Sequence, residues 1–210
     1  MKPYILAIDQ STQGTKGVVF DGEGTLLARA DRPHAQKIDA NGWVEHDPRE
    51  ILQNTLAVAR AALEKAGVDP ADLSAILITH EHQDHVSGLA VLTKKIRPPI
   101  YATPATCGQL AEQLPHGAEL LQSRLPGAGF AVGELWIEPF ATPHDAAGSV
   151  GYVLSGGGRT MALCTDLGHV TEAVRRGIRG ANLLLAEANH DVEWLQSGPY
   201  PYFLKERILG

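Results

Sequence analysis

Three histidines and an aspartate lie within one short segment of the chain, residues 80–85, whose sequence is His-Glu-His-Gln-Asp-His. Neutral imidazole nitrogens and carboxylate oxygens are the donors that proteins offer to zinc, manganese and iron. Alternation along the backbone would let His80 and His82 face one ion. Asp84 and His85 would then face a second ion about 3.5 to 4 Å away, as in two-metal hydrolytic sites. The segment predicts metal chemistry, and the alternative is a solvated histidine-rich loop.

Further ligands have to come from distant parts of the chain, and two candidates directly follow short apolar runs. His144 stands in the segment Ala-Thr-Pro-His-Asp at residues 141–145, and Asp166 ends the segment Ala-Leu-Cys-Thr-Asp at residues 162–166. A carboxylate such as that of Asp166 can bridge two ions. Each residue taken alone could equally be a turn former, because single polar residues are common at strand ends.

Strands and helices alternate along most of the chain, which predicts an α/β layered fold. Asp47, Pro48 and Glu50 form a helix start, and the helix should end at Gly67. Residues 73–79 are an apolar run, typical of a strand covered on both faces, that ends at the histidine cluster. Further strands are expected at 4–9, 17–21, 25–30, 99–102, 135–140, 149–154, 160–164 and 183–187, and further helices at 86–95, 105–114 and 170–176.

Residues 79–85 match the T-H-x-H-x-D-H motif of the metallo-β-lactamase-fold hydrolases, and the resemblance extends over residues 75–210. It implies an αββα layered sandwich, here incomplete. Four more segments are most similar to the YycJ-type branch of that family, whose members resemble 5′-to-3′ DNA exonucleases with two divalent ions. These segments are residues 99–103, 139–146, 165–170 and 187–193.

The resemblance to these hydrolases implies a ligand for each of six positions. The first ion would be held by His80, His82 and His144, the second by Asp84 and His85, and Asp166 would bridge them. The candidate catalytic residues are Asp84, His169 and His190, the two histidines because they match family positions near the site. The implied cofactors are two divalent ions, zinc or manganese, and the implied partner is single-stranded or 5′-phosphorylated DNA.

The family pattern continues beyond residues 204–210 into a G-H-L-S segment whose histidine completes the shell of the second ion. We therefore expect that shell to be incomplete here, although His190 is a possible substitute.

The first part of the chain resembles another family. Residues 8–16, 20–21 and 41–48 are similar to the amino-terminal part of the FGGY carbohydrate kinases, such as glycerol kinase, which implies a ribonuclease-H-like βββα segment. Hydroxyls, backbone N–H groups and a lysine of such a hairpin can surround phosphates, and an aspartate can meet magnesium. The candidate residues are Asp9, Thr12, Thr15 and Lys16. The alternative is an ordinary hairpin rich in serine, threonine and glycine.

Two segments of different family character are therefore predicted, a kinase-like segment at residues 1–76 and a metallohydrolase region at residues 77–210. We interpret the chain as a chimera with a crossover within residues 73–79, natural or constructed. The kinase pattern would continue as N-Q-R-E-T after residue 79, where this chain has its histidine cluster. We expect the first strands to lie beside the strand at 73–79 and to replace the first strands of the hydrolase.

The chain has 210 residues, with 18 Lys and Arg against 24 Asp and Glu, so its net charge of -6 excludes a broadly basic nucleic-acid coat. No apolar run approaches the roughly 20 residues of a membrane span, and Cys107 and Cys164 form no CxxC pair. We expect a cytoplasmic protein of unknown oligomeric state. The favoured function is metal-dependent phosphodiester hydrolysis. The alternatives are a catalytically silent chimeric fragment and a kinase fragment that binds nucleotide or polyol.

Overall fold

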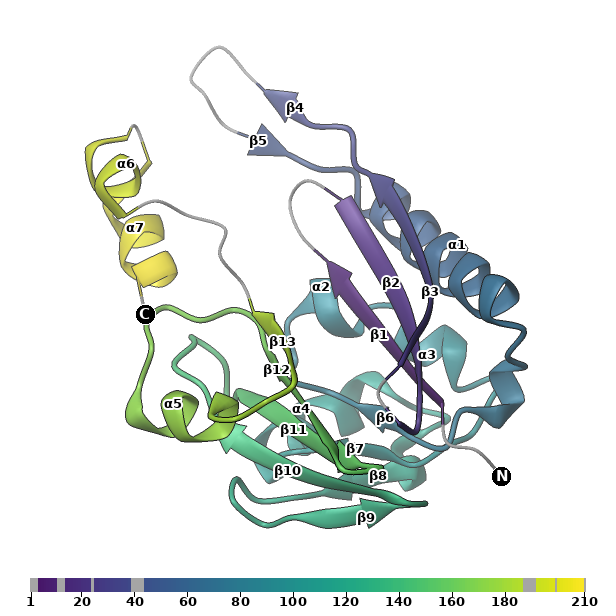
Figure 1. The fold of residues 1–210 in the computed structure, drawn as a ribbon. Coiled ribbons are helices and arrows are strands. Elements are labelled where there is room, and N and C mark those ends of the chain that lie inside the picture. The colour runs from purple at the N-terminus through teal and green to yellow at the C-terminus, as the bar shows by residue number, and fades with distance from the viewer. Residues whose placement is uncertain are drawn as a thin grey trace.

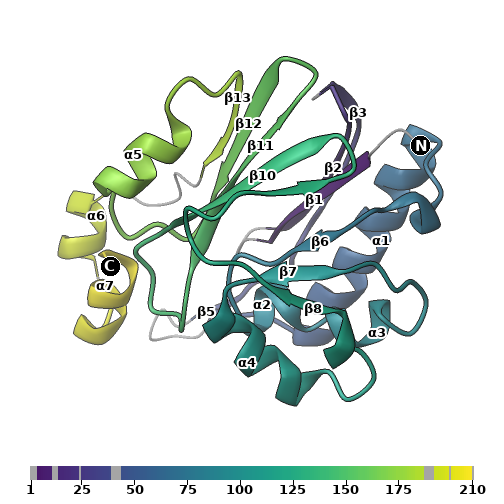
Figure 2. The same ribbon diagram turned by 90° about the horizontal axis from the view of Figure 1, so that it is seen from below.

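A computed structural model of the chain describes residues 4–10, 14–23, 25–38, 44–186, 192–198 and 200–209. Two layers of β-strands pack face to face, and helices cover the outer face of each layer (Figures 1 and 2). This αββα sandwich confirms the predicted α/β layered fold.

The first layer combines an antiparallel group and a parallel group of strands. The antiparallel strands follow the order β1 (Tyr4–Gln10), β2 (Gly14–Asp21) and β3 (Leu26–Pro33). The parallel strands follow the order β6 (Ile76–Leu77), β7 (Ile100–Ala102) and β8 (Leu121–Ser123). A parallel bridge between Tyr4 and Leu73 joins the two groups, which confirms that the first strands lie beside residues 73–79.

The second layer is a single five-stranded sheet in the order β13-β12-β11-β10-β9. Its strands are antiparallel except for the parallel pair of β12 and β13. The bounds are β9 (Phe130–Val132), β10 (Leu135–Ala141), β11 (Val150–Gly156), β12 (Arg159–Cys164) and β13 (Leu183–Ala186). A separate two-stranded ribbon consists of β4 (Lys37–Ile38) and β5 (Val44–Glu45).

Helices lie against the outer faces of both layers (Figure 2). The first layer is covered by α1 (Pro48–Ala66), α2 (Gln83–Val86), α3 (Leu89–Leu92) and α4 (Pro104–Gln113). The second layer is covered by α5 (Glu172–Ile178). The remaining helical elements are α6 (Val192–Ser197), α7 (Tyr202–Leu209) and two short 3₁₀ turns at Pro70–Asp72 and Ala118–Leu120. None of the helices in the described ranges has the length and apolar character needed to cross a membrane.

Neighbouring residues of β2 enter two different hydrophobic cores. Phe20 and Val18 face the second layer and pack in the cluster that contains Tyr152. Val19 faces the opposite way and packs with Val58 of α1. Because side chains alternate along a strand, this pattern shows that the first layer is covered on both faces. The segment that we predicted to be kinase-like therefore contributes to the core that the rest of the chain builds.

The longest predicted helix is confirmed, with the expected signals at both ends. The Asp47 side chain accepts a hydrogen bond from the N–H of Arg49, and Pro48 occupies the first turn. Gly67 ends the helix in a left-handed conformation with φ of 67°, which glycine adopts without steric cost.

Two other predicted elements differ from the structure. The strand expected at residues 73–79 is reduced to Ile76–Leu77, since it pairs with β7 over a short length before the chain turns into the histidine segment. The helix expected at residues 86–95 is divided into α2 and α3 around Ser87 and Gly88, and glycine is a poor helix former.

Candidate metal centre

Local backbone conformation explains how one short segment supplies three imidazoles. His80 and Glu81 precede α2 in non-helical backbone, and His82 is its N-cap with extended angles, φ -60° and ψ 146°. In extended backbone, residues two apart point to the same side, so His80 and His82 share a side and Glu81 points away. The first turn of α2 then places His85 near His80, with ring centroids 4.1 Å apart.

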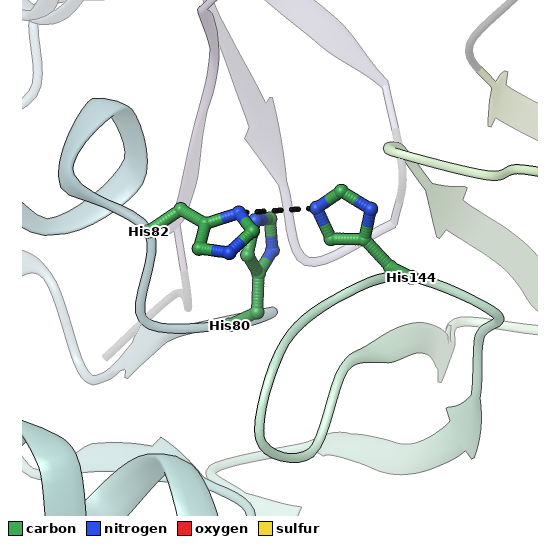
Figure 3. Close-up of side chains that lie close together, drawn as sticks. All are labelled: His80, His82 and His144. Atoms are coloured by element: carbon green, nitrogen blue, oxygen red, sulfur yellow. Dashed lines mark hydrogen bonds between the residues drawn. The ribbon is translucent and has the colours of Figure 1, made fainter. Parts of the chain in front are cut away.

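One group of possible ligands consists of His80, His82 and His144, whose nearest donor nitrogens all lie within 4.8 Å of one another. Figure 3 shows the three rings converging from two different loops. Nε2 of His144 lies 3.1 Å from Nδ1 of His82. Two nitrogens bound at about 2.0–2.1 Å to a tetrahedral zinc ion lie about 3.3 Å apart, so this spacing suits two ligands of one ion.

A second group consists of His80, His85 and Asp166, again with donor atoms within 4.8 Å of one another. Nε2 of His85 lies 3.2 Å from Oδ2 of Asp166. Because His80 belongs to both groups, the two groups adjoin. Together the two groups offer four imidazoles and one carboxylate that could hold a metal ion.

His80 provides the clearest sign that these residues fit a cation. Its side chain is fully buried, and its Nε2 has no hydrogen-bond partner among the described residues. The other ring nitrogen, Nδ1, lies 3.1 Å from the hydroxyl of Thr79. An unpaired buried polar atom costs about 1–3 kcal/mol, which a metal ion at Nε2 would offset.

The pKa of His80 favours the neutral imidazole that metal binding requires. Burial lowers this pKa to about 3, the charge of His85 lowers it as well, and Asp166 acts in the opposite sense. A histidine that is neutral at physiological pH keeps a lone pair available for a cation.

Asp166 combines an unusual backbone with an ionised carboxylate. Its φ of 54° is the only positive value of a non-glycine residue in the described part of the chain. Such a conformation costs about 1–3 kcal/mol and is concentrated at functional sites. Burial opposes ionisation, but the hydrogen bond and charge of His85, with the charges of His80 and His144, lower the pKa of Asp166 to about 2.

Hydrogen bonds from the second layer hold the backbone next to these ligands. The Tyr152 hydroxyl donates to the carbonyl of Ile78, two residues before His80, at 2.8 Å. The N–H of Val150 donates to the carbonyl of Thr79 at 3.0 Å, and the N–H of Gly168 donates to the carbonyl of Pro143 at 3.2 Å. The three ligand-bearing segments are therefore connected through their backbones.

A cavity of about 460 Å³ opens beside the ligands, with His144 among the residues that line it. Pro104, Leu125 and Pro126 contribute apolar walls, and Thr103 and Thr142 contribute hydroxyls.

Two of the proposed hydrolase residues lie outside both ligand groups, and a third is not described. The Asp84 side chain is 53% exposed, and its Oδ2 lies 3.6 Å from Nε2 of His85. His169 is exposed in the loop that follows Asp166. His190 lies outside the described residues. The roles of these three residues stay predictions.

The residues predicted from the kinase resemblance lie in a different part of the first layer. Thr15 is fully buried, and its hydroxyl lies 3.1 Å from Nε2 of His34, so this hydroxyl already has a partner within the protein. Lys16 is exposed, and its Cα lies opposite that of Asp9 in the register of β1 and β2. Thr12 lies outside the described residues. Phosphate or magnesium binding by this set stays a prediction.

Glu81 occupies a variable position of the histidine motif and was not among the residues predicted from the sequence. Its carboxylate accepts hydrogen bonds from the N–H of Ala147 and from the hydroxyl of Thr106. Burial raises the pKa of Glu81, but these bonds outweigh burial and the net shift is downward. The alternation of residues 80–82 was the available signal, because it directs Glu81 away from the side on which His80 and His82 lie.

Residues 43–200 match the profile of the beta-lactamase superfamily domain, which is more than half of the chain. The chain therefore belongs to this family. The solved structure of Zn²⁺-bound PqqB from Methylobacterium extorquens shares the fold, with a TM-score of 0.52 and 23% identity, covering 62% of this chain and 51% of that one.

Among curated relatives, the exodeoxyribonuclease YycJ of Bacillus anthracis is 38% identical over 174 residues, which cover 80% of this chain and 65% of the relative. The chain thus spans just under two thirds of the length of that relative.

Glycerol kinase of Methylorubrum extorquens (strain PA1) is 54% identical over 86 residues, covering 41% of this chain and 17% of the kinase. The family match begins at residue 43 and so reaches into the segment 1–76 that we predicted to be kinase-like. The boundary at residue 76 and the chimeric origin stay predictions.

Proposed function

We propose that this chain is a metal-dependent phosphodiester hydrolase that acts on DNA. The observation that carries the proposal is the convergence of His80, His82 and His144, and of His80, His85 and Asp166, from three distant segments. The similarity to a relative named as an exodeoxyribonuclease supports DNA as the substrate. The histidine-rich donor set favours zinc over magnesium or calcium, and the resemblance to the YycJ-type exonucleases adds manganese as the alternative and two as the number of ions.

Different side chains bind the ions and transfer protons in this proposal. The neutral histidines and the ionised Asp166 would hold the ions. Divalent ions in such a site lower the pKa of a water molecule and neutralise charge that develops on the phosphate. We assign proton transfer to Asp84, because its half-exposed carboxylate approaches His85 and remains accessible to solvent. His169 and His190 are the other candidates for this role.

The net charge of -6 does not favour a polyanionic substrate by itself. Bound cations would be the largest local charges in the site and would reverse the local field. We therefore expect DNA binding to depend on the metal, and we expect single-stranded or 5′-phosphorylated DNA to be preferred.

Metal content and DNA cleavage together test this function. Elemental analysis of the purified chain should find one to two zinc or manganese ions, and His80→Ala combined with His82→Ala should lose them. With manganese present, the wild type should release nucleotides from a 5′-phosphorylated DNA strand. An ion-loaded protein without cleavage would support the silent fragment, and a wild type that binds no ion would refute the metal centre.

We also infer that residues 1–76 have a kinase-like origin and now serve as strands and helix of the hydrolase fold. The identity to glycerol kinase supports the origin. The packing of Phe20 in the core with Tyr152 supports the structural role. Incubation with ATP and glycerol should produce no ADP above background, and polyol-dependent production of ADP would instead support the kinase alternative.

A further inference from the structure

We propose that Glu81 is a positioning residue that fixes the loop bearing His144 relative to the segment bearing His80 and His82. This inference rests on the proposed metal centre and extends it to a residue that binds no ion. Its consequence is selective: Glu81 determines how tightly the group His80, His82 and His144 holds its ion, and it has little effect on the group His80, His85 and Asp166.

The two oxygens of the Glu81 carboxylate accept hydrogen bonds from two different parts of the chain. Oε1 accepts a hydrogen bond from the N–H of Ala147 at 2.6 Å. Oε2 accepts a hydrogen bond from the hydroxyl of Thr106, in the first turn of α4, at 3.1 Å. Hydrogen bonds to an ionised carboxylate are stronger than bonds between neutral groups. The carboxylate thus joins the histidine segment to the His144 loop and to α4.

A second connection between α4 and the same loop closes a ring of hydrogen bonds. The hydroxyl of Thr103, the N-cap of α4, donates to the carbonyl of Gly148 at 2.9 Å. The same hydroxyl oxygen accepts a bond from the N–H of Thr106 at 3.3 Å. A Cβ atom on Gly148 would lie 2.5 Å from this oxygen, so the close approach depends on glycine. Ala147 and Gly148 are therefore both anchored.

His144 lies only three residues before Ala147, between two points at which its loop is fixed. The preceding residue, Pro143, accepts a bond from the N–H of Gly168 in the loop that bears Asp166. The anchors on the other side of His144 are the bonds to Glu81 and Thr103. Loss of Glu81 removes the hydrogen bond that joins the loop backbone at Ala147 to the histidine segment, while the connection at Pro143 remains.

The second ligand group does not depend on this ring. His85 is placed by the first turn of α2, where its N–H donates to the carbonyl of His82 at 2.9 Å. Asp166 follows β12 of the second layer. The hydrogen bonds of the ring join Glu81, Thr106 and Thr103 to one another and to Ala147 and Gly148. The ring therefore predicts an effect on one ion and not on the other.

The test measures Co²⁺ affinity by titration of the metal-free full chain, followed by the visible absorption of the bound ion. Two substitutions, used as backgrounds, each leave one ligand group intact. His85→Ala keeps the group that contains His144, and His144→Ala keeps the group that contains Asp166. Glu81→Ala should weaken Co²⁺ binding about 10- to 100-fold in the His85→Ala background, the range found for residues that orient metal ligands. It should leave the affinity in the His144→Ala background unchanged.

Two further variants separate positioning from a general loss of structure. Glu81→Gln keeps an oxygen for the N–H of Ala147 but loses the charge, so its affinity should lie between those of the wild type and Glu81→Ala. Glu112→Ala removes an exposed carboxylate of α4 and should bind Co²⁺ as the wild type does. Hydrogen exchange of residues 144–148 in the metal-free protein should be faster in Glu81→Ala than in Glu112→Ala.

Equal weakening in both backgrounds, or no weakening in either, would overturn the role of Glu81 while leaving the metal centre intact. A wild type that binds no Co²⁺ would overturn the metal centre and this role together. If Glu81→Ala does not fold, Glu81→Gln replaces it in the His85→Ala and His144→Ala backgrounds. Weaker Co²⁺ binding in the first background alone would support the role of Glu81, and any other pattern would overturn it.

Discussion

The hydroxyl of Tyr152 donates a 2.8 Å hydrogen bond to the carbonyl of Ile78 across the interface between the two strand layers. Tyr152 is 1% exposed, and its oxygen also lies 3.3 Å from the carbonyl of Tyr101. One side chain of the second layer thus supports the ends of β6 and β7, where the histidine segment begins. Its burial raises the pKa of the phenol, so the hydroxyl remains a donor throughout the physiological range.

Replacing Tyr152 with phenylalanine should therefore destabilise the protein and weaken metal binding together. The carbonyl of Ile78 would lose its buried donor, which costs about 1–3 kcal/mol. Urea unfolding measures the loss in the free energy of unfolding. The matched control is Tyr202→Phe, because Tyr202 is 74% exposed. An equal effect of the two substitutions would contradict the supporting role of Tyr152.

The left-handed backbone of Asp166 should be separable from its function as a ligand. Asp166→Gly and Asp166→Ala both remove the carboxylate, so both should weaken metal binding at the group with His85. Alanine in the left-handed region costs about 1–2 kcal/mol more than glycine. The metal-free alanine variant should therefore unfold at a lower urea concentration than the glycine variant. Equal midpoints would show that the loop relaxes to another conformation.

The stability of the metal-free protein should fall as the pH decreases below about 6.5, partly because of His34. This residue is buried between Thr15 and Asn54, with ring nitrogens 3.1 and 3.0 Å from their side chains. Burial lowers the pKa of His34 below its ordinary value of 6.5, His46 lowers it further, and Glu50 opposes them.

The sign of the effect follows from proton binding. Below pH 6.5 the unfolded chain binds a proton at His34 that the folded protein does not, so acidification favours unfolding. Each proton taken up contributes a slope of about 1.4 kcal/mol per pH unit. Unfolding in the presence of a chelator should show a shallower pH dependence for His34→Gln than for the wild type. A steeper dependence would contradict the neutral state of His34.

The segments 1–76 and 77–210 should unfold as one unit, because Phe20 of the first segment lies in the core of the second. Phe20 is 3% exposed and packs in the cluster of Leu135, Tyr152 and Met161. Phe20→Ala should cost about 3–5 kcal/mol, whereas Leu26→Ala, at a position that is 53% exposed, should cost little. Tryptophan fluorescence and far-UV circular dichroism should give the same transition. Two separate transitions would show independent folding.

Most of the candidate ligands and the helix caps could be predicted from the sequence, because their signals lie within short segments. Asp47 and Gly67 act within one turn of their own helix, so their roles could be predicted from neighbouring residues. The spacing of residues 80–85 likewise limits which imidazoles can face one point. The αββα arrangement followed from the resemblance, and the structure confirms it.

Other properties of the site depend on contacts between residues far apart in the chain. The grouping of His85 with Asp166, and the exposed position of Asp84 outside both groups, follow from how α2 meets the loop after β12. The left-handed backbone of Asp166 has no local signal either. Nothing in the segment 80–85 indicates that Glu81 bonds to Ala147, which lies 66 residues away.

The sequence by itself therefore determined the donor atoms and the elements that carry them, since residue type, capping and strand alternation are properties of short segments. The tertiary structure decided which donors lie close enough to share an ion, which carboxylate accepts hydrogen bonds from the Ala147 N–H and the Thr106 hydroxyl, and how the first strands join the core. These outcomes require the packing of two layers against each other, because only that packing brings residues 80, 144 and 166 within a few ångströms.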